Sequence, residues 1–197
     1  MTELFRPISY LARDATESPE AIGRAVPGVE VRTVDDAGRA LPAGEVGELW
    51  IKSPAAMQGY VNDPEETRGV LTFDGWFRTG DLATMSPDGL VRIVGRKRER
   101  ILRGGHSVFP QEVEAVLLTH PEVAEAAVVG VPHPTLGEEV HAFVALRPGA
   151  GADAGALVLY CRERLAAFKY PRQVTIVPAL PRSAAGKILR SSLRGPR

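Results

Sequence analysis

The feature of this sequence that most constrains its fold is a change of pattern at Gly95. Before Gly95, short segments such as 29–34 alternate apolar and polar residues and are separated by turn residues, as in strands with one buried face. After it come five consecutive charged residues at 96–100, and then helix-like and strand-like segments alternate. We therefore predict an α+β fold, with a small mostly-β subdomain over 1–95 and an α+β domain over 96–197.

Local patterns indicate where elements begin and end in the first part. Asp63, followed by Pro64 and two glutamates, is a helix start, because the Asp side chain caps the helix and the acids favour its dipole. Residues 86–89, Ser-Pro-Asp-Gly, form a turn that precedes a strand over 90–94. The opening residues 1–19 show no sustained period, so we predict mostly irregular structure there.

The second part reads as alternating helices and strands, with short strands around the glycine pair Gly104 and Gly105. The predicted elements that follow are a helix from Pro110, a strand over 124–131, a Pro-rich turn at 132–134, a strand over 140–146, a helix over 157–168 and a strand over 173–177. A domain of this size can bury a core without disulfides or metals.

Composition excludes several classes of protein. Of the 197 residues, 24 are Lys or Arg and 24 are Asp or Glu, so no global field favours nucleic acid or an acidic membrane surface. The single Cys161 cannot form an internal disulfide, and we interpret it as a packing thiol. Neither a long apolar stretch nor a secretion signal is visible, so the default expectation is a cytoplasmic protein without a membrane span.

Four segments carry residues suited to chemistry. They are GWFRTGD at 75–81, GRKRERI at 95–101, RGGHSVFPQEVE at 103–114 and LPRSAAGKILR at 180–190. Taken singly, each has a plain structural interpretation: a turn with a solvated Asp, a solvated charge run, a tight glycine turn and a surface Lys. Together they resemble the family of adenylate-forming enzymes that includes acyl-CoA synthetases, beetle luciferases and peptide-synthetase adenylation domains.

The resemblance implies a role for several residues. Asp81 would accept hydrogen bonds from both ribose hydroxyls of the nucleotide, which suits an ionised carboxylate, and Arg96 would also contact the nucleotide. Glu99 would be the hinge between a large and a small domain. Gly104 and Gly105 would face the pantetheine arm of CoA, since glycines let backbone approach a ligand closely.

Lys187 is the predicted catalytic residue. The resemblance implies that its ammonium meets the carboxylate and the α-phosphate, where a compact mobile cation suits the developing charge. The family motif usually has Thr where this chain has Ala185. At the other end, Met1, Thr2 and Glu3 resemble the tail of a motif in which Thr contacts the α-phosphate and Glu holds Mg²⁺.

The resemblance covers only the C-terminal portion of such enzymes, and no Gly-rich phosphate loop is present in this chain. We therefore expect part of an acid–CoA ligase, of the kind that serves fatty acid metabolism, which uses ATP, Mg²⁺ and CoA and is inactive or incomplete alone. Its expected partners are a carboxylic acid, ATP, CoA or a carrier protein, and a separate N-terminal chain. Two alternatives stay open: a non-catalytic module that binds nucleotide, CoA or a carrier protein, and part of a peptide-synthetase adenylation domain.

Overall fold

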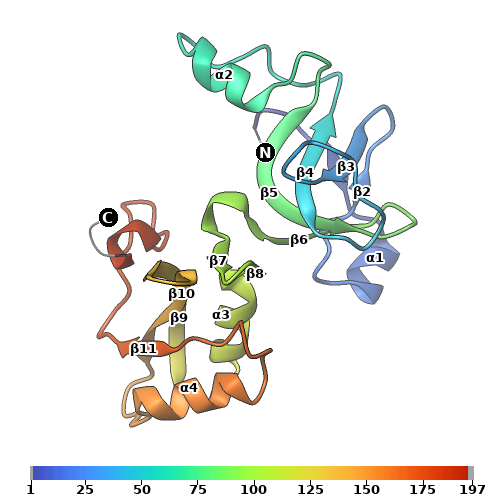
Figure 1. The fold of residues 1–197 in the computed structure, drawn as a ribbon. Coiled ribbons are helices and arrows are strands. Elements are labelled where there is room, and N and C mark those ends of the chain that lie inside the picture. The colour runs from blue at the N-terminus through green and yellow to red at the C-terminus, as the bar shows by residue number, and fades with distance from the viewer. Residues whose placement is uncertain (1, 195–197) are drawn as a thin grey trace. The chain divides into compact units, whose positions relative to one another are not determined.

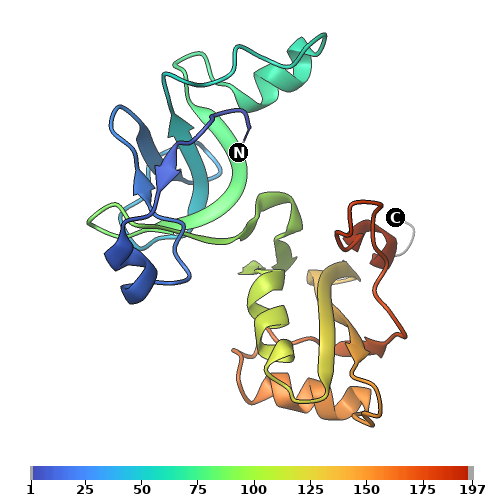
Figure 2. The same cartoon turned by 180° about the vertical axis from the view of Figure 1, so that it is seen from behind.

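The computed structural model describes residues 2–194, without the side chains of residues 13, 15 and 17. It divides into two compact units, one ending at Arg98 and the other beginning at Glu99. Each unit has its own sheet, as Figures 1 and 2 show, and its own core of buried apolar side chains. The boundary expected after Gly95 falls inside the last strand of the first unit.

Unit 1, which ends at Arg98, is built on a four-stranded antiparallel sheet in the order β3-β4-β5-β6. Its elements are β1 (Ile8–Ser9), α1 (Ala12–Glu17), β2 (Arg24–Ala25), β3 (Glu30–Val34), β4 (Gly47–Lys52), α2 (Pro64–Val70), β5 (Phe77–Met85) and β6 (Val91–Arg96). Asp63 caps α2 as expected, because its carboxylate accepts the N–H of Glu66 at 2.9 Å.

Alternation along β4 gives the sheet two covered faces. Leu49 and Ile51 are buried in the main core of unit 1, together with Leu4 and Phe77. On the opposite face, Trp50 packs with Val34 and Trp76, and the Arg32 guanidinium lies over the Trp76 ring at 3.9 Å. The sheet is therefore held from both sides, although one of them is covered by only a few side chains.

The prediction of mostly irregular structure over 1–19 holds for the larger part of the described residues in that range, but it missed β1 and α1, which lie within it. Helix α1 has six residues, too few for an apolar period to be visible in the sequence. It is held instead by Asp14, whose carboxylate accepts the N–H of Leu11 at 3.2 Å and pairs with Arg24 of β2 at 3.0 Å. The ion pair between Asp14 and Arg24 therefore stabilises a helix that the local sequence pattern does not predict.

Unit 2, which begins at Glu99, has a mixed five-stranded sheet centred on β10. Strand β10 pairs antiparallel with β9 and β7 and parallel with β11, while β7 also pairs with β8. The elements are β7 (Ile101–Arg103), β8 (His106–Val108), α3 (Pro110–Leu118), β9 (Val123–His133), β10 (Gly137–Leu146), α4 (Ala154–Arg162), β11 (Gln173–Ile176) and the 3-10 turn η2 (Arg190–Leu193); a further 3-10 turn, η1 (Lys97–Glu99), spans the junction of the units.

Both long helices of unit 2 pack on one face of its sheet. Val113 and Leu117 of α3, and Leu157 and Cys161 of α4, are fully buried against alternate residues of β9 and β10. Together with the antiparallel sheet of unit 1, this arrangement confirms the predicted α+β class.

Several element boundaries in unit 2 differ from the sequence prediction; β10, for example, begins at Gly137 and not at residue 140. The Pro-rich stretch 132–134 is not the turn: Pro132 and His133 still belong to β9, which pairs with β10 on one side only. An edge strand tolerates a proline because the missing N–H can face away from the ladder. The predicted helix 157–168 starts earlier, where Asp153 caps α4, and ends at Arg162.

Cys161 is fully buried in the core of unit 2, as a packing thiol should be. Burial raises the pKa of this thiol to about 11, with a small opposing contribution from Arg164. No helix in the described part of the chain combines the length and the apolar character needed to cross a membrane.

We predict that Cys161 resists alkylation by iodoacetamide at pH 8 in the folded chain and reacts fully in denaturant, because the thiolate is the reactive species and both burial and the raised pKa suppress it. Mass spectrometry of the intact chain measures the labelling. Rapid modification without denaturant would contradict the burial of this side chain.

Candidate active-site segments

A bulge in β5 presents Asp81. The register between β4 and β5 shifts between Glu48 and Trp50, which leaves Leu49 without a direct partner. The buried hydroxyl of Thr79 donates to the Leu49 carbonyl at 2.8 Å and accepts the N–H of Asp81 at 3.0 Å. Thr79 thus satisfies two backbone groups that the bulge removes from the ladder, and this keeps the bulge in one shape.

Asp81 and Arg96 face each other across β5 and β6. Arg96 Nε lies 2.7 Å from Asp81 Oδ1, and the Asp81 side chain is 15% exposed while that of Arg96 is 49% exposed. Burial raises the pKa of Asp81, and the Arg96 charge offsets this only in part. Gly80, with φ of 69°, makes the turn of the backbone just before Asp81. Two predicted nucleotide-binding residues are therefore adjacent.

Lys97, near the end of unit 1, forms ion pairs with two carboxylates. Its ammonium lies 3.0 Å from the carboxylate of Glu48 and 3.2 Å from that of Asp36. Burial lowers the pKa of Lys97, but the hydrogen bonds and charges of these two carboxylates outweigh it and hold the pKa above its ordinary value. Glu48 is buried on β4, so Lys97 neutralises a carboxylate that has little access to water.

The predicted phosphate and Mg²⁺ residues lie at the start of unit 1. Thr2 is exposed, and its carbonyl accepts the N–H of Phe5 at 3.4 Å. The carboxylate of Glu3 accepts the hydroxyl of Tyr60 at 3.4 Å, and partial burial, then the charge of Glu3, raise the pKa of Tyr60. Met1, quoted with them, lies outside the described residues. No cluster of three metal-ligating side chains occurs within residues 2–194.

Gly104 and Gly105 form the turn between β7 and β8, both with positive φ, 55° and 82°. The N–H of Gly104 donates to the Leu136 carbonyl at 2.8 Å, and a Cβ on Gly104 would come within 3.2 Å of the Leu136 side chain. Beside the turn, Arg103 pairs with Glu139 of β10. The glycine turn is therefore fixed to the β9–β10 hairpin, and its conformation favours glycine at both positions.

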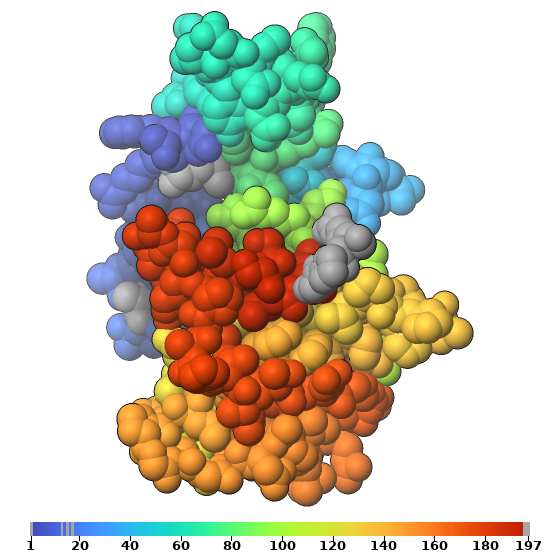
Figure 3. Space-filling view, turned by 90° about the vertical axis from the view of Figure 1, so that its left-hand side faces the viewer, coloured from blue at the N-terminus to red at the C-terminus, as the bar shows by residue number. Residues whose placement is uncertain are grey.

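Lys187 lies on a small hairpin near the end of the chain. The N–H of Ser183 donates to the Lys187 carbonyl at 2.8 Å, and the turn between them passes through Gly186 with φ of 77°. The Lys187 side chain is exposed and makes no hydrogen bond or ion pair among the described residues. Figure 3 shows this terminal segment, in red, open to the viewer at the surface.

One arginine, Arg190, joins Glu99 to the segment that carries Lys187. Arg190 Nη1 lies 3.4 Å from Glu99, and its Nη2 lies 2.9 Å from the buried Glu114 of α3. The predicted hinge residue thus belongs to unit 2 and is tied to the segment that carries the predicted catalytic lysine.

The residues that hold these sites were missed as functional positions in the sequence. Thr79, Glu114 and Arg190 all lie inside the quoted segments, where they carried no assigned role. One signal was available for Glu114, because it lies on the helical face of Pro110, Val113 and Leu117, which have i, i+3 and i+7 spacing, and yet it is charged.

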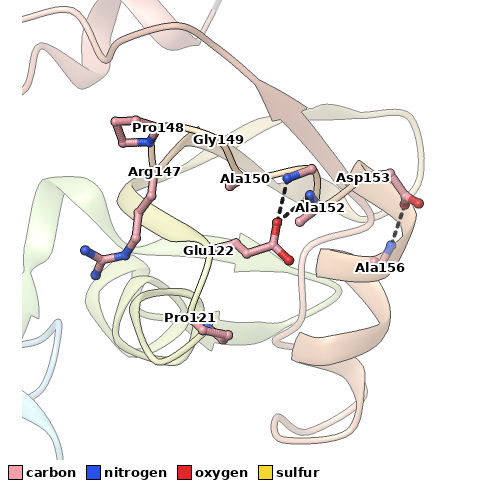
Figure 4. Close-up of a pocket in the computed structure, with 10 residues that line it drawn as sticks. Pro121, Glu122, Arg147, Pro148, Gly149, Ala150, Ala152, Asp153 and Ala156 are labelled. Carbon is pink, nitrogen blue, oxygen red and sulfur yellow. Dashed lines mark hydrogen bonds between the residues drawn. The ribbon is translucent and has the colours of Figure 1, made fainter.

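A separate pocket of about 620 Å³ lies in unit 2 between the loop before α4 and the start of β9. Figure 4 shows the Glu122 carboxylate turned toward that loop, where it accepts the N–H groups of Gly151 and Ala152 at 2.7 and 2.8 Å. None of the predicted site residues lines this pocket.

Comparison with known proteins gives the family. Residues 1–61 match the model of the AMP-binding enzyme, and residues 112–187 match that of the AMP-binding enzyme C-terminal domain. The chain belongs to the AMP-binding enzyme family. This confirms the resemblance seen in the four segments. The chain is 42% identical over 194 residues to a long-chain-fatty-acid–CoA ligase of Salmonella typhimurium, covering 98% of this chain and 34% of that protein.

Solved structures of this family share the fold. The o-succinylbenzoate CoA synthetase MenE of Bacillus subtilis, in complex with its acyl-adenylate intermediate, superposes with a TM-score of 0.90 at 33% identity, over 100% of this chain and 40% of that one. The amide bond synthetase McbA of Marinactinospora thermotolerans gives a TM-score of 0.80 at 43% identity, over 89% and 36%. The chain therefore spans about a third of the length of the curated relatives it matches.

We predict that Thr79→Val destabilises unit 1 by about 1–3 kcal/mol relative to Thr79→Ser, because Val leaves the Leu49 carbonyl and the Asp81 N–H without their partner whereas Ser keeps the hydroxyl. Urea unfolding followed by tryptophan fluorescence measures this, since both tryptophans, Trp50 and Trp76, lie in unit 1. Equal midpoints for the two variants would show that the hydroxyl does not hold the bulge.

Proposed function

We propose that this chain is the C-terminal part of an ATP-dependent acid–CoA ligase, which converts a carboxylic acid to an acyl adenylate and then to a thioester. The observation that carries the proposal is Lys187: an exposed ammonium without a partner among the described side chains, on a hairpin whose backbone is fixed. An ordinary surface lysine does not require a backbone that is fixed in this way. The named activities of the relatives, two of them CoA ligation, favour the same reaction class.

Lys187 is suited to the first step of that reaction. When a carboxylate oxygen attacks the α-phosphorus of ATP and pyrophosphate leaves, negative charge grows on the phosphoryl oxygens. An ammonium on a flexible stem can follow this charge, and it starts without an ion pair that would have to break. In the second step a thiol attacks the acyl carbonyl and AMP leaves.

Asp81 and Arg96 are suited to holding the nucleotide. The Asp81 carboxylate can accept both hydroxyls of a ribose, since an ionised carboxylate has acceptor sites beyond the one at Oδ1 that Arg96 Nε approaches. Arg96 is half-exposed and can turn toward a phosphate or the ribose. A raised pKa at Asp81 is the cost of partial burial, which also keeps water from competing for the same oxygens.

Glu3 fits one ligand position of Mg²⁺ bound with ATP, because Mg²⁺ is usually held by one or two carboxylates and by substrate phosphates. Its carboxylate accepts a long hydrogen bond, 3.4 Å, from the Tyr60 hydroxyl, and a cation can replace this contact. The bound ion would neutralise phosphate charge. Thr2, exposed beside it, would contact the α-phosphate.

The junction between the units is suited to a hinge at Glu99. Lys97 is anchored to Glu48 inside unit 1, and Glu99 is anchored to Arg190 inside unit 2. Only Arg98 separates these anchors, so changes of the backbone angles at Arg98 and Glu99 can turn one unit without breaking either ion pair. Such a turn would bring Gly104 and Gly105 to the pantetheine arm of CoA in the second step.

A separate N-terminal chain fits the exposed apolar residues of unit 1. Phe5 is 82% exposed, Val61 is 89% exposed and Phe73 is fully exposed, although each is a large apolar side chain. Such a chain would supply the phosphate loop and the acid pocket. We propose a cytoplasmic setting, where ATP and CoA are available. The acceptor distinguishes two cases, because the thiol of CoA and the thiol of a carrier protein would both attack the same adenylate.

We predict that the chain alone catalyses no ATP–pyrophosphate exchange, and that adding the N-terminal two thirds of the Salmonella ligase restores acid-dependent exchange. Lys187→Ala should reduce the restored exchange by roughly 100-fold or more, the usual effect of removing a charge-stabilising donor. Lys52→Ala, a lysine outside the proposed site, is the matched control. Unchanged exchange in Lys187→Ala would contradict the catalytic assignment, and exchange by the chain alone would contradict its dependence on a partner.

We also predict that Asp81→Asn weakens AMP binding to the restored pair by roughly 10-fold or more, because an ionised acceptor is replaced by a neutral one. AMP affinity of the unchanged pair should fall as the pH drops through the raised pKa of Asp81, since the protonated carboxyl accepts poorly. Calorimetric titration measures both. Asp74→Asn, an exposed carboxylate before β5, should bind AMP normally; equal losses in both variants would argue against a ribose site.

A further inference from the structure

The terminal segment of unit 2 is a preformed hairpin. Arg182 and Ile188 form a β-bridge, and the N–H of Leu189 donates to the Pro181 carbonyl at 2.8 Å. Lys187 lies between these bonds and the turn at Gly186. A hairpin of this length is too short to be stable by itself, so something outside it must hold its legs.

The two legs are held by arginines of very different environment. Arg182 pairs with Glu125 of β9, but its side chain is 45% exposed and that of Glu125 is 37% exposed. An ion pair at the surface contributes little. Arg182 Nη1 also donates to the Gly186 carbonyl at 2.7 Å, but this bond lies within the hairpin and does not join it to the rest of unit 2. Arg190, on the other leg, reaches a buried carboxylate, and its contacts are therefore the ones that can fix the segment.

Arg190 binds Glu114 as a fork. Its Nη2 lies 2.9 Å from both carboxylate oxygens, and its Nε lies 3.3 Å from one of them. Glu114 is 8% exposed, and the same oxygen accepts the N–H of Val128 in β9 at 2.8 Å. Helix α3, strand β9 and the terminal segment therefore meet at one carboxylate, and charge-assisted bonds of this kind are strong and directional.

We propose that Arg190 is a positioning residue for Lys187: by its fork on Glu114 it fixes the hairpin that presents the Lys187 ammonium. Arg190 follows Lys187 closely in the sequence, so the fork limits how far the lysine backbone can move. Its remaining nitrogen, Nη1, reaches Glu99 at 3.4 Å, which places the lysine segment and the first residue of unit 2 on one side chain. The catalytic part of this inference rests on the proposed function, whereas the fixing of the hairpin does not.

Hydrogen exchange of the 197-residue chain tests the positioning role directly. In Arg190→Gln, the amides of Ser183 and Leu189, both bonded within the hairpin, should exchange roughly 10- to 100-fold faster, while amides of β9 and β10 keep their protection. Because Arg190→Gln leaves a buried carboxylate unpaired and can unfold unit 2, the variant Arg190→Gln with Glu114→Gln removes both charges. Arg190→Lys, which keeps the charge but not the fork, should recover part of the protection.

Two controls separate local from general effects. Glu125→Gln removes the charge of the exposed pair but leaves the bond of Arg182 to the Gly186 carbonyl, and it should change the same amides by less than Arg190→Gln does. Lys187→Ala should leave hairpin protection unchanged, because its side chain holds nothing. In the restored pair, Arg190→Lys should lower kcat of pyrophosphate exchange by up to roughly 100-fold with little change in KM for ATP, since misplacement affects the chemical step.

Three results would overturn the proposal: unprotected hairpin amides in the unchanged chain, unchanged protection in the double Gln variant, or an equal loss of protection in β9, β10 and the hairpin. The last would make Arg190 a general stabiliser of unit 2. An inactive pair that still loses hairpin protection in the Arg190 variants would count against the proposed function alone and would support the fixing of the hairpin.

Discussion

A buried carboxylate has to be paired, and two of them decide where the ends of the two units lie. Glu48 on β4 and Glu114 on α3 are each 8% exposed. Each captures a basic residue from the last segment of its own unit, Lys97 in one case and Arg190 in the other. Removing one partner of such a pair costs about 3–5 kcal/mol, because a charge is left without water or a counter-ion. The pairs thus act less as added stability than as a specification of where each terminal segment must return.

The residues proposed for chemistry follow the opposite rule. The Lys187 ammonium is exposed without a partner among the described residues, and Arg96 is half-exposed although it touches Asp81. A charged side chain that is fully paired within the protein has few acceptor or donor sites free for a substrate. A side chain that is positioned through its backbone, by neutral groups or by buried ion pairs of its neighbours, keeps those sites free and still lies in one place. The Thr79 hydroxyl positions the backbone of Asp81 in this way, and the bonds of Arg190 to Glu114 position the segment of Lys187.

Much of the fold followed from the sequence because its signals are local. Alternation over 29–34, the Asp63–Pro64 helix start and the glycine pair each describe a few neighbouring residues, and β3, α2 and the β7–β8 turn lie where these signals place them. Helix α1 depends on the distant pair of Asp14 and Arg24, and Pro132 stays in β9 because that strand has one free edge. Neither fact is visible in a short window. The site residues were quoted by resemblance, but their supports came only from three-dimensional pairing.

The same pairing bears on the proposal that a further segment completes the site. Each unit closes its own buried charges, so neither needs the other, or a further segment, to satisfy Glu48 or Glu114. Large apolar side chains such as Phe5 and Val61 stay exposed, and so does the Lys187 ammonium. Under the proposed function, apolar cover and a phosphate loop are what a further segment would add. The ion pairs within each unit thus fix its end segment, and the exposed apolar and charged side chains stay available for the proposed partner and substrate.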